Sequence, residues 1–137
     1  EYYEYKSEQA IFKGALKDGE PDGVWCVFNV AGKLLGQFPY GDGKIDGVAP
    51  FFYENGDLLA QVTYKNGVIA GYKEFFPDGT LRMEIAYRKG VRHGTAKFYY
   101  NTGHLLCEGR YKNGRQAGKW RYYRVTGEKR DDFLIYD

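Results

Sequence analysis

The sequence of 137 residues is poor in the residue types that build most metal and redox sites. It holds two Cys, two His and one Met. Cys26 and Cys107 lie in different repeats of the chain. In a stack of strands they would be about 30 Å apart, whereas a disulfide requires Cα atoms within about 7 Å. His93 and His104 each stand beside a glycine, where a turn explains them better than a metal does. We expect no disulfide, metal or cofactor.

Long hydrophobic runs and helical patterns are also missing. No apolar run approaches the ~20 residues that span a bilayer. No segment keeps a 3.6-residue period over ten residues, and glycine interrupts every candidate helix. We expect no charged-then-apolar leader of the signal-peptide kind within these residues. Since the sequence starts at Glu1 rather than Met, we expect a trimmed N-terminus, with any export signal or lipid anchor upstream.

Glycine, in contrast, is abundant and regularly spaced. Fifteen of the nineteen glycines form three series that recur every 23 or 24 residues. Such a period indicates one supersecondary unit stacked on copies of itself. The four exceptions are Gly14, Gly36, Gly41 and Gly109. The series are Gly23, Gly47, Gly71, Gly94 and Gly118; Gly19, Gly43, Gly67, Gly90 and Gly114; and Gly32, Gly56, Gly79, Gly103 and Gly127.

Aromatic residues make up 18% of the chain, an excess that favours strands. Each period holds an aromatic pair such as Phe51 and Phe52, then a turn tripeptide (ENG, PDG or NTG). A second arm follows, in which apolar residues alternate with polar ones, and a KNG or RKG turn closes the period. Alternation places one apolar row on a single sheet face. We expect the structural core at Tyr40, Tyr64, Tyr87, Tyr111, Leu58, Leu81 and Leu105.

These patterns predict an all-β fold, an elongated antiparallel single-sheet solenoid of stacked β-hairpins with about eleven strands. We expect one repeat domain over residues 1–137, with five to six repeats of 23–24 residues. Turn positions are assigned to Gly47, Gly71, Gly94, Gly118, Gly67 and Gly114. The predicted repeats are 1–23, 24–47, 48–71, 72–94, 95–118 and a partial copy at 119–137.

One recurring row of carboxylates raises the question of catalysis. Glu84, Glu108 and Asp132 hold the same position in neighbouring repeats, about 10 Å apart by strand geometry. This spacing matches the carboxylates of an inverting glycosidase. Gln37 and Gln61 continue the row, however, so we interpret it as an outward polar row. We expect no catalytic residues and no enzyme activity.

Charge is unevenly distributed along the chain. Residues 1–71 hold six Lys and Arg against ten Asp and Glu, and residues 72–137 hold fourteen against eight. The basic half could face an acidic protein, anionic lipid or single-stranded nucleic acid, or be a solvated surface. We favour an acidic protein and disfavour nucleic acid. The expected partner contacts are Arg88, Arg92, Lys112, Arg115, Trp120 and Arg121.

The segments FFYENGDLLAQVTYKNG (51–67), FYYNTGHLLCEGRYKNG (98–114) and VRHG (91–94) carry a recognisable pattern. The pattern resembles the MORN repeat, and more closely its bacterial variant in antitoxin components of toxin–antitoxin systems. This resemblance implies a non-catalytic protein-binding scaffold, in its sharpest form an antitoxin-like or immunity-like protein that blocks a toxin or effector domain. It also implies a bacterial cytoplasm or cell envelope.

Two alternatives to an inhibitor remain open. One is a structural adaptor at an envelope or membrane surface that binds anionic lipid or envelope proteins. The other is the accessory module of an enzyme whose catalytic part lies elsewhere. The second repeat has Gly41 and Asp42 where others have Lys and Asn, and the first has no ENG-type turn. We expect the N-terminal end to be a cap or an altered contact surface.

Overall fold

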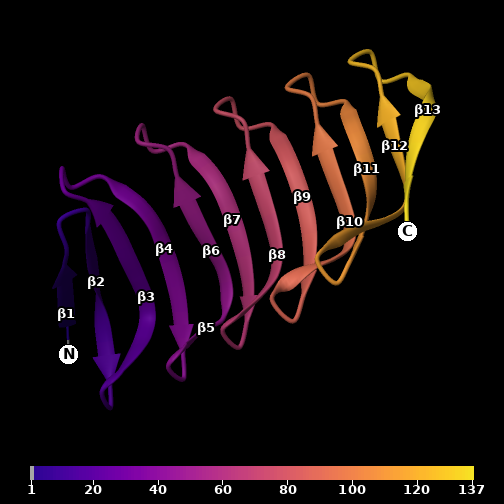
Figure 1. Cartoon of the computed structure of the whole chain (residues 1–137). Coiled ribbons are helices and arrows are strands. Elements are labelled where there is room, and N and C mark those ends of the chain that lie inside the picture. The colour runs from indigo at the N-terminus through magenta and orange to yellow at the C-terminus, as the bar shows by residue number, and fades with distance from the viewer. Residues whose placement is uncertain (1) are drawn as a thin grey trace. The chain divides into compact units, whose positions relative to one another are not determined.

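The computed structural model describes residues 2–137 and consists of strands and turns (Figure 1). Thirteen strands are present, which confirms the all-β prediction and exceeds the eleven expected, because an N-terminal strand and a two-residue strand add to the hairpins. No described segment forms a helix long and apolar enough to cross a membrane. The repeats that the sequence placed in one domain fall into two compact units, one ending at Val68 and one beginning at Ile69.

The first unit is an antiparallel sheet of consecutive hairpins. Its strands lie in the order β1-β2-β3-β4-β6-β7, and the short β5 pairs with β4. All of these pairs are antiparallel, as a meander requires. The strands are β1 (Tyr2–Lys6), β2 (Ala10–Lys17), β3 (Glu20–Asn29), β4 (Leu34–Gly41), β5 (Lys44–Ile45), β6 (Gly47–Phe52) and β7 (Leu58–Lys65).

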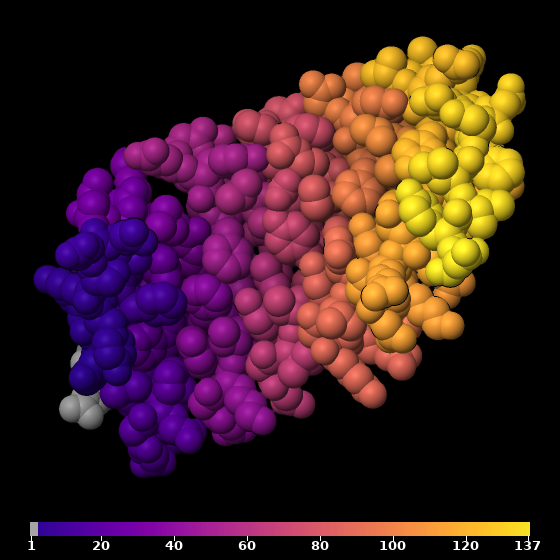
Figure 2. Space-filling model, in the orientation of Figure 1, coloured from indigo at the N-terminus to yellow at the C-terminus, as the bar shows by residue number. Residues whose placement is uncertain are grey.

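The second unit repeats the same construction. Its strands follow chain order from β8 to β13, each antiparallel to the next. Within each unit, the residues of successive repeats lie side by side in the space-filling view (Figure 2). The strands are β8 (Val68–Phe75), β9 (Leu81–Arg88), β10 (Val91–Tyr99), β11 (Leu105–Lys112), β12 (Arg115–Tyr123) and β13 (Lys129–Tyr136).

Two kinds of turn alternate along the chain. In the two-residue turns both residues have positive φ, the sign pattern of a type I′ hairpin. In the longer turns a glycine donates to the carbonyl three residues earlier, as Gly56 does to Tyr53 at 2.9 Å. The two kinds lie at opposite edges of the sheet in each unit (Figure 1). The two-residue turns are Asp18-Gly19, Asp42-Gly43, Asn66-Gly67, Lys89-Gly90 and Asn113-Gly114.

The predicted turn glycines divide between turns and strands. Gly67 and Gly114 lie in two-residue turns, as expected. The other four are corrected, because they lie within strands: Gly47 begins β6, and Gly71, Gly94 and Gly118 lie inside β8, β10 and β12. Gly94 has a φ of 100° at a register shift between Arg92 and Ala96. A β-bulge there uses the left-handed backbone freedom of glycine.

The buried face differs from the predicted core in its centre. The predicted Tyr and Leu residues are all half-buried, and Tyr87 and Tyr111 pack against the buried cluster of the second unit. Smaller side chains and two tryptophans occupy the centre instead. Among the described residues, the buried apolar ones are Trp25, Ala49, Ala60 and Val62 in the first unit and Ile85, Ala96, Cys107 and Trp120 in the second.

Each unit contains one tryptophan whose ring lies on a glycine. A Cβ added to Gly14 or to Gly109 would overlap the ring of Trp25 or Trp120. The Trp25 Nε1 donates to the Ala15 carbonyl at 2.9 Å, which satisfies the buried indole. The Trp120 Nε1 donates to the Arg110 carbonyl at 3.2 Å in the same way. The rings explain why these two glycines fall outside the repeating series.

Candidate interaction surface

The structure separates the six predicted contact residues into three places. Four of them, Arg88, Arg92, Lys112 and Arg115, are exposed and flank the two-residue turns of the second unit. Arg121 lies on the polar face of that sheet, opposite the buried cluster. Trp120 is corrected: it is 2% exposed, so its ring belongs to the core and is not available for a partner.

The turns of the second unit form a strongly basic edge. Residues 86–94 and 110–118, which surround the two turns, hold six Lys and Arg and no Asp or Glu. All six side chains are exposed. None of them forms an ion pair within the described part of the chain. We call this set the basic edge: Arg88, Lys89, Arg92, Arg110, Lys112 and Arg115.

Arg92 has a structural role at the basic edge. Its guanidinium stacks on the Tyr111 ring at 4.5 Å from the ring centroid and donates to the Gly114 carbonyl at 3.3 Å. The backbone N–H of Gly114 returns a bond to the Arg92 carbonyl at 2.8 Å. The Asn113 N–H donates to His93 Nδ1 at 3.2 Å. These contacts join the two turns into one surface, which leaves the other cations free to meet a partner.

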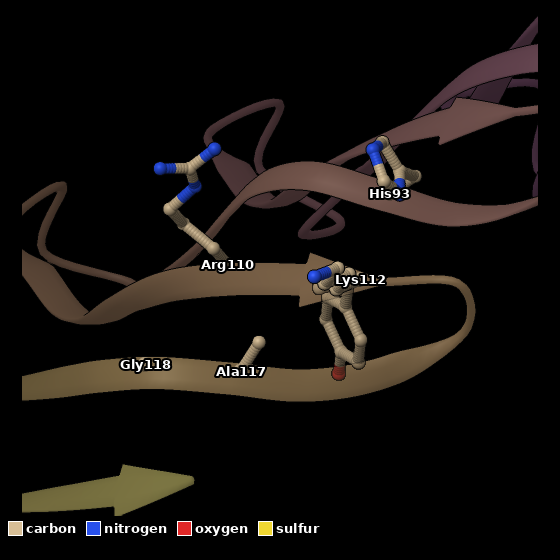
Figure 3. Close-up of a pocket in the computed structure, with 6 residues that line it drawn as sticks. His93, Arg110, Lys112, Ala117 and Gly118 are labelled. Atoms are coloured by element: carbon tan, nitrogen blue, oxygen red, sulfur yellow. The ribbon is translucent and has the colours of Figure 1, made fainter. Parts of the chain in front are cut away.

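A shallow open pocket of about 360 Å³ lies at the basic edge. Figure 3 shows His93 on β10 and Arg110 and Lys112 on β11, beside Ala117 and Gly118 of β12. Tyr111 completes the lining, and its ring packs on Trp120. The Arg110 and Lys112 side chains suit a carboxylate or another anionic group. These two cations therefore stand at a mostly apolar pocket within the basic edge.

Charges on the polar face of the second unit are arranged differently. A row of opposite residues runs across five strands with alternating sign, from Lys73 through Glu84, Lys97 and Glu108 to Arg121. The Lys73 Nζ lies 3.5 Å from a Glu84 carboxylate oxygen. Each carboxylate thus stands between two cations, as the interpretation of an outward polar row expects. The charges within this row largely cancel, whereas those of the basic edge do not.

Other members of the carboxylate row have local partners. Tyr123 donates its hydroxyl to Glu108 at 2.9 Å. Burial and then this bond raise the pKa of Tyr123. Asp132 does not join the row, because Phe133 lies opposite Arg121 in the β12–β13 pair. Instead, Arg130 donates to Asp132 through two bonds of 2.7 and 2.8 Å.

The turns of the first unit form an edge of the opposite sign, which the sequence analysis did not single out. Residues 15–23 and 39–47 hold five Asp and Glu against two Lys. Several of the acidic side chains line a pocket of about 390 Å³. Aligning the turns position by position would have revealed this reversal. We call this set the acidic edge: Asp18, Glu20, Asp22, Asp42 and Asp46.

Two segments of the chain match a known repeat family. Residues 45–66 and 92–113 match the model of the MORN repeat variant. Each match covers one hairpin, from β6 to β7 and from β10 to β11, and ends at a two-residue turn. No curated protein matches the sequence. Repeats of this kind are generally modules that bind proteins or membranes.

Solved structures of TarM are similar in fold. A crystal structure of TarM aligns with 74% of this chain and 20% of its own, at 13% identity and a TM-score of 0.50. A mutant of S. aureus TarM in complex with Fondaparinux, alpha-GlcNAc-glycerol and UDP aligns with 69% and 19%, at 13% identity and a TM-score of 0.51. The chain thus spans about a fifth of TarM, and the likeness concerns the fold.

The sequence pattern and the matches agree on the kind of unit. The matched hairpins carry the aromatic pair, the turn tripeptide and the closing Asn-Gly that the glycine series predicted. One match lies in the first unit and the other in the second. Two segments of this chain, one in each unit, therefore match the MORN repeat variant.

Proposed function

We propose that this chain is a non-catalytic protein-binding module that presents its basic edge to an acidic surface of a partner protein. The observation that carries this proposal is a row of six exposed cations without one counter-charge in the surrounding turns. Such a row attracts an acidic partner over a distance and orients it during encounter. The alternating row on the polar face offers no comparable field.

The composition of the basic edge also suits a protein interface. Arg and Tyr are enriched at the centres of protein interfaces, where they supply much of the binding energy. Here the Arg92 guanidinium stacks on the half-buried ring of Tyr111, 4.5 Å from the ring centroid. Successive turns lie two strands apart, about 10 Å by strand spacing. The edge therefore offers cations at a repeated spacing, which a single acidic group would not match.

A more specific form of the proposal is inhibition. Supported by the resemblance alone, the partner would be a toxin or effector domain, and this chain would act as an antitoxin-like or immunity-like protein that covers it. A partner captured from the native source and expressed alone should then inhibit growth, and co-expression of this chain should restore it. Harmless expression of a stoichiometric partner would remove the inhibitory role and leave the binding role intact.

The test of the binding surface compares two variants of equal charge. Arg88→Glu, Lys112→Glu and Arg115→Glu together should abolish capture of the partner in a pull-down. The matched control, Lys33→Glu, Arg124→Glu and Lys129→Glu, makes the same change in net charge away from the basic edge and should retain capture. Equal capture by both variants would contradict the proposal.

The second candidate function is an adaptor for an anionic membrane, which the same cations favour. Flotation with vesicles rich in phosphatidylserine separates the two functions. Binding to vesicles that depends on Arg88, Lys112 and Arg115, with no stoichiometric protein captured, would replace the proposed function with the adaptor. Capture of one protein without vesicle binding would support the protein-binding module.

A further inference from the structure

The two edges carry opposite charges at equivalent positions of the repeat. Asp18 and Asp42 occupy the first turn position, which Lys89 occupies in the second unit. Glu20 occupies the position after the turn, where the second unit has Arg115. At these positions the same backbone presents carboxylates in one unit and cations in the other, whereas Lys17 and Lys44 of the first unit and Asn113 of the second do not follow the reversal.

The carboxylates of the acidic edge are not neutralised within the chain. In the described residues none of the five lies within ion-pair distance of a Lys or Arg, although Lys17 and Lys44 belong to the same turns. The Glu20 carboxylate lies directly over Gly43, next to Asp42 in sequence. Asp46 accepts a bond from the Asn66 N–H at 3.1 Å, a backbone contact that leaves its charge in place.

We propose that the acidic edge binds the basic edge of a second copy of this chain. Both edges are rows of two-residue turns on the same hairpin repeat, so their charges recur at the same spacing of about 10 Å. Opposite charges at equal spacing can meet turn by turn. Exposed ion pairs are individually weak, so the contact depends on the row as a whole and is screened by salt.

This inference goes beyond the proposed function and does not depend on it, because it is tested with the purified chain alone. Where both hold, a second copy and the partner protein compete for one surface, the basic edge. Self-association would then keep the basic edge occupied until a partner whose acidic surface binds more tightly displaces the second copy. An unrelated acidic protein does not predict the charge reversal between the two units, whereas a second copy does.

The experiment exchanges the charges of the two edges. One variant, Asp18→Lys, Glu20→Arg and Asp42→Lys, makes both edges basic. The other, Arg88→Glu, Lys89→Asp, Lys112→Glu and Arg115→Glu, leaves two cations against four carboxylates at the basic edge and so makes both edges acidic. The turns should accept these residues, because Lys89 and Arg115 already hold the corresponding positions, and Lys89 does so at a φ of 51°.

Sedimentation velocity at low salt measures association of each species. The wild-type chain should associate and become monomeric as salt is raised. Each variant alone should be monomeric, and an equimolar mixture of the two should associate again. The Lys33→Glu, Arg124→Glu and Lys129→Glu control should associate like the wild type. Thermal unfolding by circular dichroism establishes that each variant is folded.

Three results would overturn the inference. The first is a wild-type chain that stays monomeric at low salt. The second is association that persists in either variant alone, which would locate the contact on another surface. The third is a mixture of folded variants that fails to associate while the wild type does, which would show that the edges do not meet each other.

Discussion

At the residue scale, the two tryptophan–glycine pairs are the most constrained features. The Trp120 ring lies on Gly109, packs edge-on against Tyr111 at 5.4 Å between centroids and lies 6.3 Å from Tyr136. An aromatic ring of this size fills space only if its neighbour lacks a side chain. The Trp120 ring therefore occupies the space that a side chain at Gly109 would take, and the two residues together fill one layer of the core.

The first prediction concerns this missing side chain. Gly109→Ala should destabilise the protein by about 1–3 kcal/mol, because the new methyl group forces the Trp120 ring or the strand to move. Gly41→Ala is the matched control, since no atom lies within 4 Å of its added Cβ. Urea unfolding monitored by tryptophan fluorescence measures both. Equal stability of the two variants would show that the ring does not depend on the glycine.

The second prediction concerns the ring shared by the core and the basic edge. Tyr111→Ala should cost about 3 kcal/mol of folding free energy, as large core truncations do, since Trp120 and Arg92 both pack on this ring. Tyr111→Phe keeps both contacts and loses only a 3.4 Å bond from Arg92, so it should change stability by less than about 1 kcal/mol. Chemical unfolding measures the free energy of unfolding of both variants. A large loss in the Phe variant would assign the stability to the hydroxyl.

The third prediction concerns the buried thiol. Burial, and secondarily the charge of Glu108, raises the pKa of Cys107 from 9.0 to about 11. Since the folded pKa exceeds the unfolded one, the stability linked to the protonated thiol is fully present below pH 9. It is lost as the pH rises towards 11. Cys107→Ala removes this loss, and the same repeat position holds Ala60, which a buried strand accepts.

Stability curves of the wild type and Cys107→Ala between pH 8 and 11 make the comparison. The wild type should lose free energy of unfolding relative to Cys107→Ala as the pH rises. Thiol labelling at pH 8 gives a second measurement: Cys26, half-buried on the polar face, should react before Cys107. A constant difference, or faster labelling of Cys107, would contradict the assigned burial.

At the scale of the element, the two-residue turn decides where each hairpin reverses. Asn and Asp tolerate the positive φ of its first position, and the sequence correctly predicted the turns from Asn-Gly and Lys-Gly pairs. It did not distinguish a turn glycine from a bulge glycine such as Gly118, with a φ of 67° inside β12. Both positions require a left-handed backbone, so both select glycine. Only the pairing of the strands separates them.

The fourth prediction uses the one turn that begins with lysine. Lys89→Asn should stabilise the protein by about 0.5 to 1 kcal/mol, because asparagine adopts a φ of this sign at less cost than lysine. Asn66 and Asn113 hold the same position in other turns, with φ of 50° and 49°. Lys33→Asn, at a position without positive φ, should be nearly neutral. Melting temperatures compare them, and an unstable Lys89→Asn would show that Lys89 makes a contact of its own.

At the scale of the whole molecule, the charge is divided between the units. Residues 1–68 hold six Lys and Arg against ten Asp and Glu, and residues 69–137 hold fourteen against eight. The structure adds that these charges are concentrated at the turns, where aligned repeats place them in rows. The net charge of +2 therefore represents neither edge, because a partner that binds one edge encounters only the charges of that edge.

The fifth prediction tests this concentration of charge. Two triple variants have the same net charge. One carries Arg88→Glu, Lys112→Glu and Arg115→Glu, and the control carries Lys33→Glu, Arg124→Glu and Lys129→Glu. On a cation exchanger at neutral pH, the control should be retained longer, because its basic edge is intact and can face the resin. Coincident elution would mean that net charge, and not the edge, governs how the chain meets a polyanion.

The amino-acid sequence alone determined the repeat, the strand class and the position of most turns, since these depend on short-range rules: backbone sign, alternation and spacing. The tertiary structure decided which residues share a surface. It buried Trp120 over Gly109, interleaved the carboxylate row with lysines, and gathered the turn charges into two edges of opposite sign. Burial and strand register join residues far apart in the chain, so the pattern within one repeat could not specify these contacts. The sign of the two edges is the exception, because aligning the turns of successive repeats reveals it.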